Sequence, residues 1–139
     1  MVPDQENTLN FFRFEDLRIY SKALDYVNWL HGVAVSMPES YQESVVLPFL
    51  KSAQNVALSI AEGSSRNKAQ FIYYLKMAKS SVRECVVYTT IASRLAVLSE
   101  EDKNYSRTQL MEMTKMIGSL VSSLQKLVPN TKDDDMDMA

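Results

Sequence analysis

Residues 67–98 read NKAQFIYYLKMAKSSVRECVVYTTIASRLAVL and contain neither glycine nor proline. Apolar or small side chains recur in this stretch at steps of three and four residues, which is the spacing of one face of an α-helix. That face comprises Phe71, Leu75, Ala78, Val82, Cys85, Thr89, Ala92 and Ala96. The stretch therefore predicts a single long helix, about 45 Å in length at a rise of 1.5 Å per residue.

Three further segments show the same spacing on either side of this helix. They are expected at residues 16–38, at 45–63 or 48–63, and at 99–129. Asp16 is the expected N-cap of the first segment, and Gly63 with the serines that follow it is typical of a helix C-terminus. The acidic residues 100–102 suit the positive end of the last helix.

The first segment carries two apolar faces side by side. The face expected to meet the core comprises Leu17, Tyr20, Leu24, Val27, His31 and Ala34. The neighbouring face comprises Ile19, Ala23, Tyr26, Leu30, Val33 and Met37. Further apolar positions outside the expected core are Trp29, Phe49, Val86, Val87 and Val121. A large leftover apolar surface predicts a protein partner, and identical subunits are the simplest one.

Composition limits the class of protein. The 139 residues suit one domain, 46% are apolar and 23% charged, and there are only three glycines and four prolines. Such a chain favours long helices over a turn-rich β-sandwich. Because short connections make consecutive helices antiparallel, we expect an all-α, up-down-up-down four-helix bundle over 14–128. A flexible N-terminal arm at 1–13 and an acidic disordered tail at 129–139 complete the expected organisation.

Side chains that could carry catalysis or hold a metal are scarce. The single cysteine, Cys85, excludes an internal disulfide and a cysteine zinc site, and the single histidine, His31, is expected to pack in the core. No glycine-rich phosphate loop or metal-ligand spacing occurs, so we expect no metal, no cofactor and no enzymatic activity. The N-terminus is polar and no apolar run approaches a membrane span, which favours a cytoplasmic protein without a membrane partner.

Charge is segregated along the chain although the net charge is only −2. Residues 51–94 hold seven basic and two acidic side chains, whereas residues 129–139 hold one lysine and four aspartates. The basic residues predicted to share one side of the long helix are Lys68, Lys76, Lys79, Arg83 and Arg94. This stripe is a candidate nucleic-acid interface, and Tyr73 and Tyr74 could stack bases beside it. The alternative is a solvated face whose cations pair with Glu84 or with the acidic start of the last helix.

The middle of the chain also carries a motif. Its residues are Ser59, Ile60, Ala61, Glu62, Gly63, Arg66, Phe71, Leu75, Ala78, Ser81 and Glu84. With Phe14, Asp16 and Leu17 near the start of the first helix and Pro38 after it, this pattern resembles that of a four-helix bundle family. This is the 23S rRNA-intervening sequence protein family, which includes the accessory variability determinant of diversity-generating retroelements. From spacing alone, Glu62 is expected to form an ion pair or a capping contact, and Glu84 a polar link between helices.

The resemblance covers about residues 14–128, and it implies an assembly and a function that the sequence pattern alone does not. It implies a ring-like homopentamer of four-helix bundles and, in the retroelement branch, nucleic-acid binding alongside a reverse transcriptase. It implies no known catalytic activity. We therefore favour a non-enzymatic oligomeric scaffold or adaptor, accessory to a nucleic-acid or reverse-transcriptase complex. The two alternatives are a protein that binds RNA or DNA directly through the basic stripe, and a small enzyme or ligand carrier that uses the bundle interior.

Overall fold

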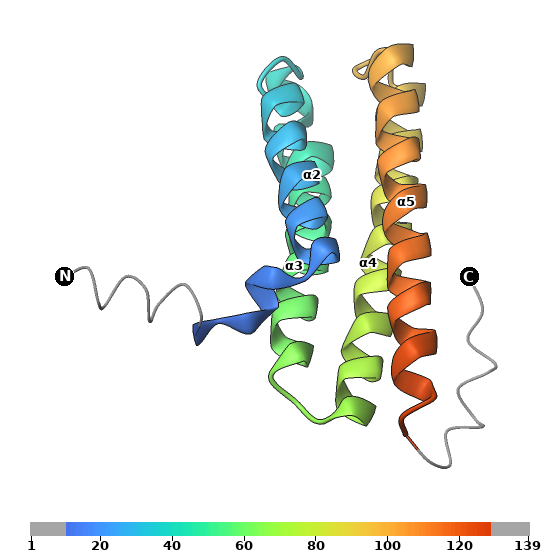
Figure 1. The fold of residues 1–139 in the computed structure, drawn as a ribbon. Helices are drawn as coiled ribbons and strands as arrows, with labels where there is room; N and C mark the ends of the chain where they lie inside the picture. Colours follow the sequence, from blue (N-terminus) through green and yellow to red (C-terminus); the bar gives the residue numbers. More distant parts are fainter. Residues whose placement is uncertain (1–10, 129–139) are drawn as a thin grey trace.

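The computed structural model of the chain describes residues 11–128, and over that range the chain is helical without a strand (Figure 1). The four long helices are α2 (Arg18–Ala34), α3 (Leu47–Ser64), α4 (Lys68–Arg94) and α5 (Glu100–Gln125). Three short helical turns, η1 (Arg13–Asp16), η2 (Glu39–Tyr41) and η3 (Gln42–Val46), precede α2 and connect α2 to α3. The predicted all-α class with four helices is confirmed. Most of the predicted arm and all of the predicted tail lie outside the described residues.

Helix α4 is central to the packing. It has extensive contacts with both α3 and α5, whereas α2 packs mainly on α3 and less on α5. Figure 1 shows α3 and α4 meeting at a tight turn at one end of the molecule, where α5 also ends. The main core comprises Ile19, Ala23, Tyr26, Leu30, Phe49, Ala53, Val56, Ala57, Ile60, Leu75, Ala78, Val82, Cys85, Leu110, Met113 and Ile117. The inward faces predicted for the second, third and fourth helices supply most of these residues.

The prediction for the first helix is wrong about which face is buried. Ile19, Tyr26 and Leu30, expected to be left over, are 1–3% exposed, while Leu24 and His31 lie on the exposed side. Phe49, also expected outside the core, is buried. The two candidate faces are almost equally apolar along the chain, so the packing of α2 on α3 and α5 decides between them. The surface available to a partner therefore lies elsewhere than predicted.

Helix ends agree with the sequence at two of the three positions that carry a polar cap. The side chains of Asn67 and Ser99 accept hydrogen bonds from the third residue of α4 and of α5, at 2.9 and 3.0 Å. Asp16 is not the N-cap of α2, because it belongs to η1 and Leu17 takes the cap position. Its carboxylate lies 3.6 Å from Arg13 instead.

Gly63 serves close packing rather than helix termination. It lies within α3, which ends at Ser64, and the described residues contain no glycine with positive φ. A Cβ atom placed on Gly63 would lie 2.5 Å from Cβ of Tyr74 and 3.0 Å from the Phe71 ring. No real Cβ contact is that short, so the crossing of α3 and α4 requires glycine here.

One buried chain of hydroxyl groups joins three helices. Tyr26 of α2 contacts Ser106 Oγ of α5 at 2.7 Å, and Ser106 contacts Thr89 Oγ1 of α4 at 2.8 Å. Thr89 donates its proton to the carbonyl of Cys85, so it must accept from Ser106, and Ser106 must accept from Tyr26. Burial raises the pKa of the Tyr26 phenol, which keeps this donor protonated. The direction of every bond is therefore determined, and the chain holds α2, α4 and α5 in register.

One stretch of the described helices, Glu39–Ser64, is long and apolar enough to resemble a membrane span, with a mean hydropathy of 1.2. Charged residues interrupt the stretch at Glu39, Glu43, Lys51 and Glu62, so it does not contradict the prediction that no uncharged apolar run approaches a membrane span. The stretch contains the core residues Phe49, Val56 and Ile60, which accounts for its apolar character without a bilayer. Its resemblance to a membrane span is weak for this reason.

Gly63, which lies at the crossing, and Gly118, which has open space around it, make a matched test of this packing. We expect Gly63→Ala to lower the free energy of unfolding by about 2 kcal/mol, because forced overpacking outweighs the gain in helix propensity. Gly118→Ala, with nothing within 4 Å of the added Cβ, should raise it by about 0.5–1 kcal/mol. Urea unfolding followed by circular dichroism measures both, and equal effects of the two variants would contradict the close approach.

The hydroxyl chain makes a second prediction. Ser106→Ala leaves the buried Tyr26 phenol without its acceptor, so we expect a loss of about 1–3 kcal/mol in the free energy of unfolding. Ser122→Ala, at an exposed position of the same helix, should change it by less than about 0.5 kcal/mol. If the loss at Ser106 were no larger than at Ser122, the chain of bonds would not hold the helices together.

Candidate nucleic-acid interface

The five predicted basic residues all lie on α4, and Lys68 and Arg94 are its first and last residues. At 100° per residue they share an arc of about 80° along a helix about 40 Å long. Ile72 falls in the middle of this arc and is buried. The arc therefore does not point straight into solvent but follows an edge of the packed surface of α4. Lys76 and Lys79 are half-buried accordingly, while Lys68, Arg83 and Arg94 are exposed.

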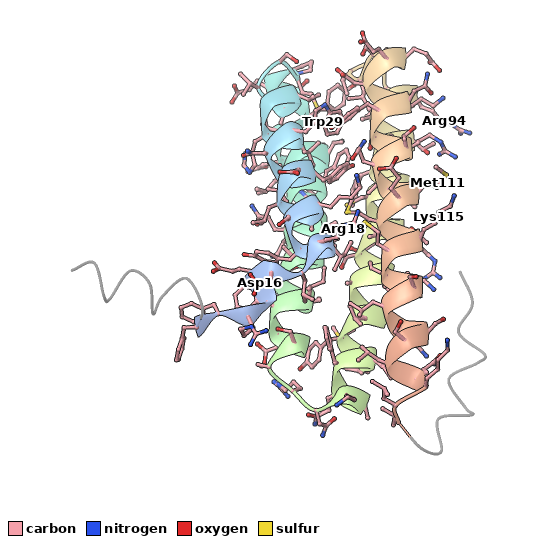
Figure 2. All side chains as sticks on the ribbon, in the orientation of Figure 1. Asp16, Arg18, Trp29, Arg94, Met111 and Lys115 are labelled. Atoms are coloured by element: carbon pink, nitrogen blue, oxygen red, sulfur yellow. The ribbon has the colours of Figure 1, made fainter. Side chains whose placement is uncertain are left out.

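The contacts of α4 show which edge this is. Tyr88 stacks on Phe49 of α3 at 5.7 Å, and the Ser52 hydroxyl of α3 donates to Glu84 at 2.8 Å. Those positions mark the side of α4 that meets α3, and the basic arc lies at the other side, toward α5. We call the basic arc of α4, together with the outer side of α5 next to it, the basic face. Figure 2 shows Arg94 and Met111 along the outer flank of this helix pair.

Helix α5 adds one cation to this edge that no motif in the sequence marks. Arg107 is exposed and follows Ser106, which faces α4. Its place next to the α4 stripe follows from the packing of α5 on α4, and only a helical-wheel comparison of both segments could have indicated it. Lys115, also exposed, lies instead on the α2 side of α5, where it lines a groove with Asp16 and Arg18.

The acidic residues of these two helices face other partners. Glu84, the only acid between Lys68 and Arg94, accepts from Ser52 as described. On α5, Glu112 is the only acid between 103 and 125, and its carboxylate lies 2.6 Å from Lys22 of α2. The acidic start of α5 pairs locally, since Glu100 lies 3.8 Å from Lys103. These contacts concentrate positive charge on the basic face and direct negative charge toward α2 and α3.

Tyr73 and Tyr74 differ in how much of each ring is available to stack on a base. Tyr74 packs beside Gly63, and the Arg66 guanidinium lies 5.2 Å above its ring. Tyr73 contacts the edge of Tyr74 at 5.3 Å and is 60% exposed. Only Tyr73 therefore offers a free aromatic surface.

The motif residues that suggested a family fall into a buried group and a group that is partly buried or exposed. Ile60, Gly63, Leu75, Ala78 and Ser81 are buried at the contact between α3 and α4. The others, partly buried or exposed, are Asp16, Leu17, Ser59, Ala61, Glu62, Arg66, Phe71 and Glu84. The expected ion pair is confirmed between Arg66 and Glu62, and it raises the pKa of the guanidinium. Glu84 links α4 to α3 through Ser52, as expected for a polar contact between helices. Glu84 itself is exposed to solvent rather than buried.

A strip of exposed apolar side chains runs along α4 beside the basic arc, on the side nearer α3. We call it the apolar strip, and its members are Tyr73, Met77, Val87 and Ile91, exposed by 60, 42, 56 and 37%. At 100° per residue they span about 80° of the helix. Val87 is the one predicted leftover residue that is clearly exposed.

Buried groups in the described part of the chain offer little chemistry. Cys85 is fully buried, and desolvation raises the pKa of its thiol to about 12, so the thiolate nucleophile is disfavoured. Every buried side-chain nitrogen or oxygen has a hydrogen-bond partner over residues 11–128. No cluster of three potential metal ligands occurs among them. The chemistry available on this chain is therefore mostly that of its surface.

These features define an all-helical, four-helix protein whose α4 carries neighbouring basic and apolar strips. The 23S rRNA-intervening sequence protein family matches residues 15–119, most of the chain, and the chain belongs to this family. The family is uncharacterised and is not a known family of enzymes. No curated protein matches the chain.

Proposed function

We propose that this chain is a non-enzymatic, cytoplasmic scaffold that works as a homo-oligomer. Its subunit is an up-down-up-down bundle, and the resemblance to the accessory variability determinant points to a ring-like homopentamer accessory to a nucleic-acid or reverse-transcriptase complex. The apolar strip on α4 carries this proposal. Exposed apolar side chains gathered on one helix side are more costly in water than scattered ones, and a second copy of the chain would cover them.

Self-association is tested with paired charge insertions. We expect the wild-type protein to be larger than its 15.8 kDa monomer, and Met77→Glu with Val87→Glu to shift it toward the monomer, because charge in an apolar contact is costly. Size-exclusion chromatography with light scattering measures the mass. Val35→Glu with Leu24→Glu, at exposed apolar positions of α2 and its end, is the matched control and should leave the mass unchanged. A monomeric wild-type protein would refute the scaffold.

A second candidate function, direct binding of RNA or DNA, is favoured by the basic face. Five cations on one edge of α4 are joined by Arg107 of α5, while Glu84 of α4 contacts α3 and Glu112 of α5 contacts α2. Cations in such a row gain affinity for a polyanion by releasing its counterions. Assembly into a ring would repeat the face in every subunit and raise the local positive potential. The exposed Tyr73 ring would add stacking on an unpaired base.

Charge reversal on the basic face tests this candidate. Lys79→Glu with Arg83→Glu should leave the helical circular dichroism spectrum intact and weaken RNA binding at least about tenfold at low salt. The slope of log affinity against log salt should also fall by about 1–2, since two phosphate contacts are lost. Fluorescence anisotropy with a labelled single-stranded RNA gives both quantities.

The control for this experiment changes the net charge equally at another surface. Arg18→Glu with Lys51→Glu reverses two exposed cations, on α2 and α3, and should reduce binding far less. Equal losses from the two double variants would show that only net charge matters, and unchanged binding in the α4 variant would remove the interface.

The interior ligand-carrier hypothesis gains no support from a core whose described polar groups are all hydrogen-bonded.

A further inference from the structure

The acidic end of the chain begins beside the basic face. Helix α5 ends at Gln125, at the same end of the molecule as Lys68, the first residue of α4 (Figure 1). The last described residue is Val128, and residues 129–139 follow it with four aspartates and one lysine, a net charge of −3. The strongest cluster of negative charge in the sequence is therefore attached next to one end of the strongest row of positive charge.

The spacing of the aspartates gives their reach. They occupy positions 133, 134, 135 and 137, five to nine residues beyond Val128. An extended chain spans at most about 3.4 Å per residue, so these carboxylates can reach points about 17–31 Å from the end of the described helix. Shorter distances are accessible to a less extended chain.

The register of α4 and α5 shows which cations lie within that reach. Thr89 bonds Ser106, so these two residues lie level in the pair. At 1.5 Å per residue along the antiparallel axes, Lys76 and Arg83 then lie about 14 and 24 Å from the level of the last described residue. Arg94 lies at about 40 Å, beyond the aspartates.

We propose that the aspartates of residues 133–137 bind the section of the basic face between Lys76 and Arg83 and compete there with a polyanion. The proposal rests on the second candidate function, because the site regulated is the same basic face. Carboxylates replace phosphates on the same cations, so occupation by the tail excludes the nucleic-acid backbone. The outer section near Arg94 stays accessible and allows an RNA strand to bind first and displace the tail.

Tethering makes such a weak contact effective. A single exposed ion pair contributes little, but a segment attached a few residues away has an effective concentration in the millimolar range. The competition is reversible and weakens with salt, because screening acts over about 8 Å at physiological ionic strength. The tail would therefore raise the threshold for RNA binding and favour long polyanions over short ones.

The first experiment neutralises the tail in the full chain. The variant carries Asp133→Asn, Asp134→Asn, Asp135→Asn and Asp137→Asn, and its affinity for a fluorescein-labelled single-stranded RNA is compared with wild type by anisotropy. We expect about tenfold tighter binding at low salt, with the difference fading as salt rises. The matched control removes four exposed acids elsewhere, by Glu15→Gln, Asp25→Asn, Glu39→Gln and Glu43→Gln, and should tighten binding much less.

The second experiment detects the contact without RNA. A nitroxide is attached through Met138→Cys, and Cys85 does not compete for the reagent because it is buried with a thiol pKa of about 12. We expect paramagnetic broadening of the amide signals of residues 76–83, little broadening near Arg94, and loss of the effect when the aspartates are neutralised. The same broadening with and without the aspartates would overturn the proposal.

The two readouts separate the failures of the two proposals. RNA binding with equal affinity in wild type and the tail-neutralised variant overturns regulation by the tail while the nucleic-acid function stands. Localised, aspartate-dependent broadening without RNA binding by either protein supports the tail contact and removes the nucleic-acid function. If the control variant gains as much RNA affinity as the tail-neutralised variant, the effect is due to net charge, and this result also overturns the proposal.

Discussion

The close crossing of α3 and α4 at Gly63 is the constraint on which the rest of the molecule depends. Because no side chain separates the backbone of Gly63 from Tyr74, the two helices meet tightly near their shared turn. From that point the hairpin buries Ile60, Leu75 and Ala78, and α4 becomes the central helix of the packing. Several residues of the motif, among them Gly63, Phe71 and Leu75, lie at or near this crossing.

Because α4 is the central helix, little of its surface is exposed to solvent, and this determines where the candidate sites lie. Helix α4 is covered by α3 on one side and by α5 on the other, so only its outer side can meet a partner. That side is divided lengthwise into the basic arc nearer α5 and the apolar strip nearer α3. A protein contact and a polyanion contact can therefore be made by one helix at the same time, which is what an oligomeric scaffold for a nucleic-acid complex requires. The proposed contact of the acidic tail would act on the basic arc, because the tail follows Val128 at the end of the helix pair where Lys68 begins α4.

Much of the fold was predictable because α4 and α5 carry clear helical patterns. Their caps, Asn67 and Ser99, are polar residues followed by long helical spacing, and the side chain of each accepts a capping hydrogen bond. The basic residues of α4 were predictable for the same reason, since a helix wheel places them on one side. Arg107 was not, because its proximity to those residues depends on how α5 packs on α4.

The sequence by itself determined the helical class, the positions of the helices and the segregation of charge, since local periodicity and capping depend on residues close in the chain. Only the tertiary structure decided which of the two apolar faces of α2 is buried, because both are similarly apolar and packing against α3 and α5 buries Ile19, Tyr26 and Leu30. It also decided that Gly63 is a packing residue rather than a helix terminator. Both outcomes depend on how closely two helices approach each other, and the spacing of residues within one helix gives no information about that distance.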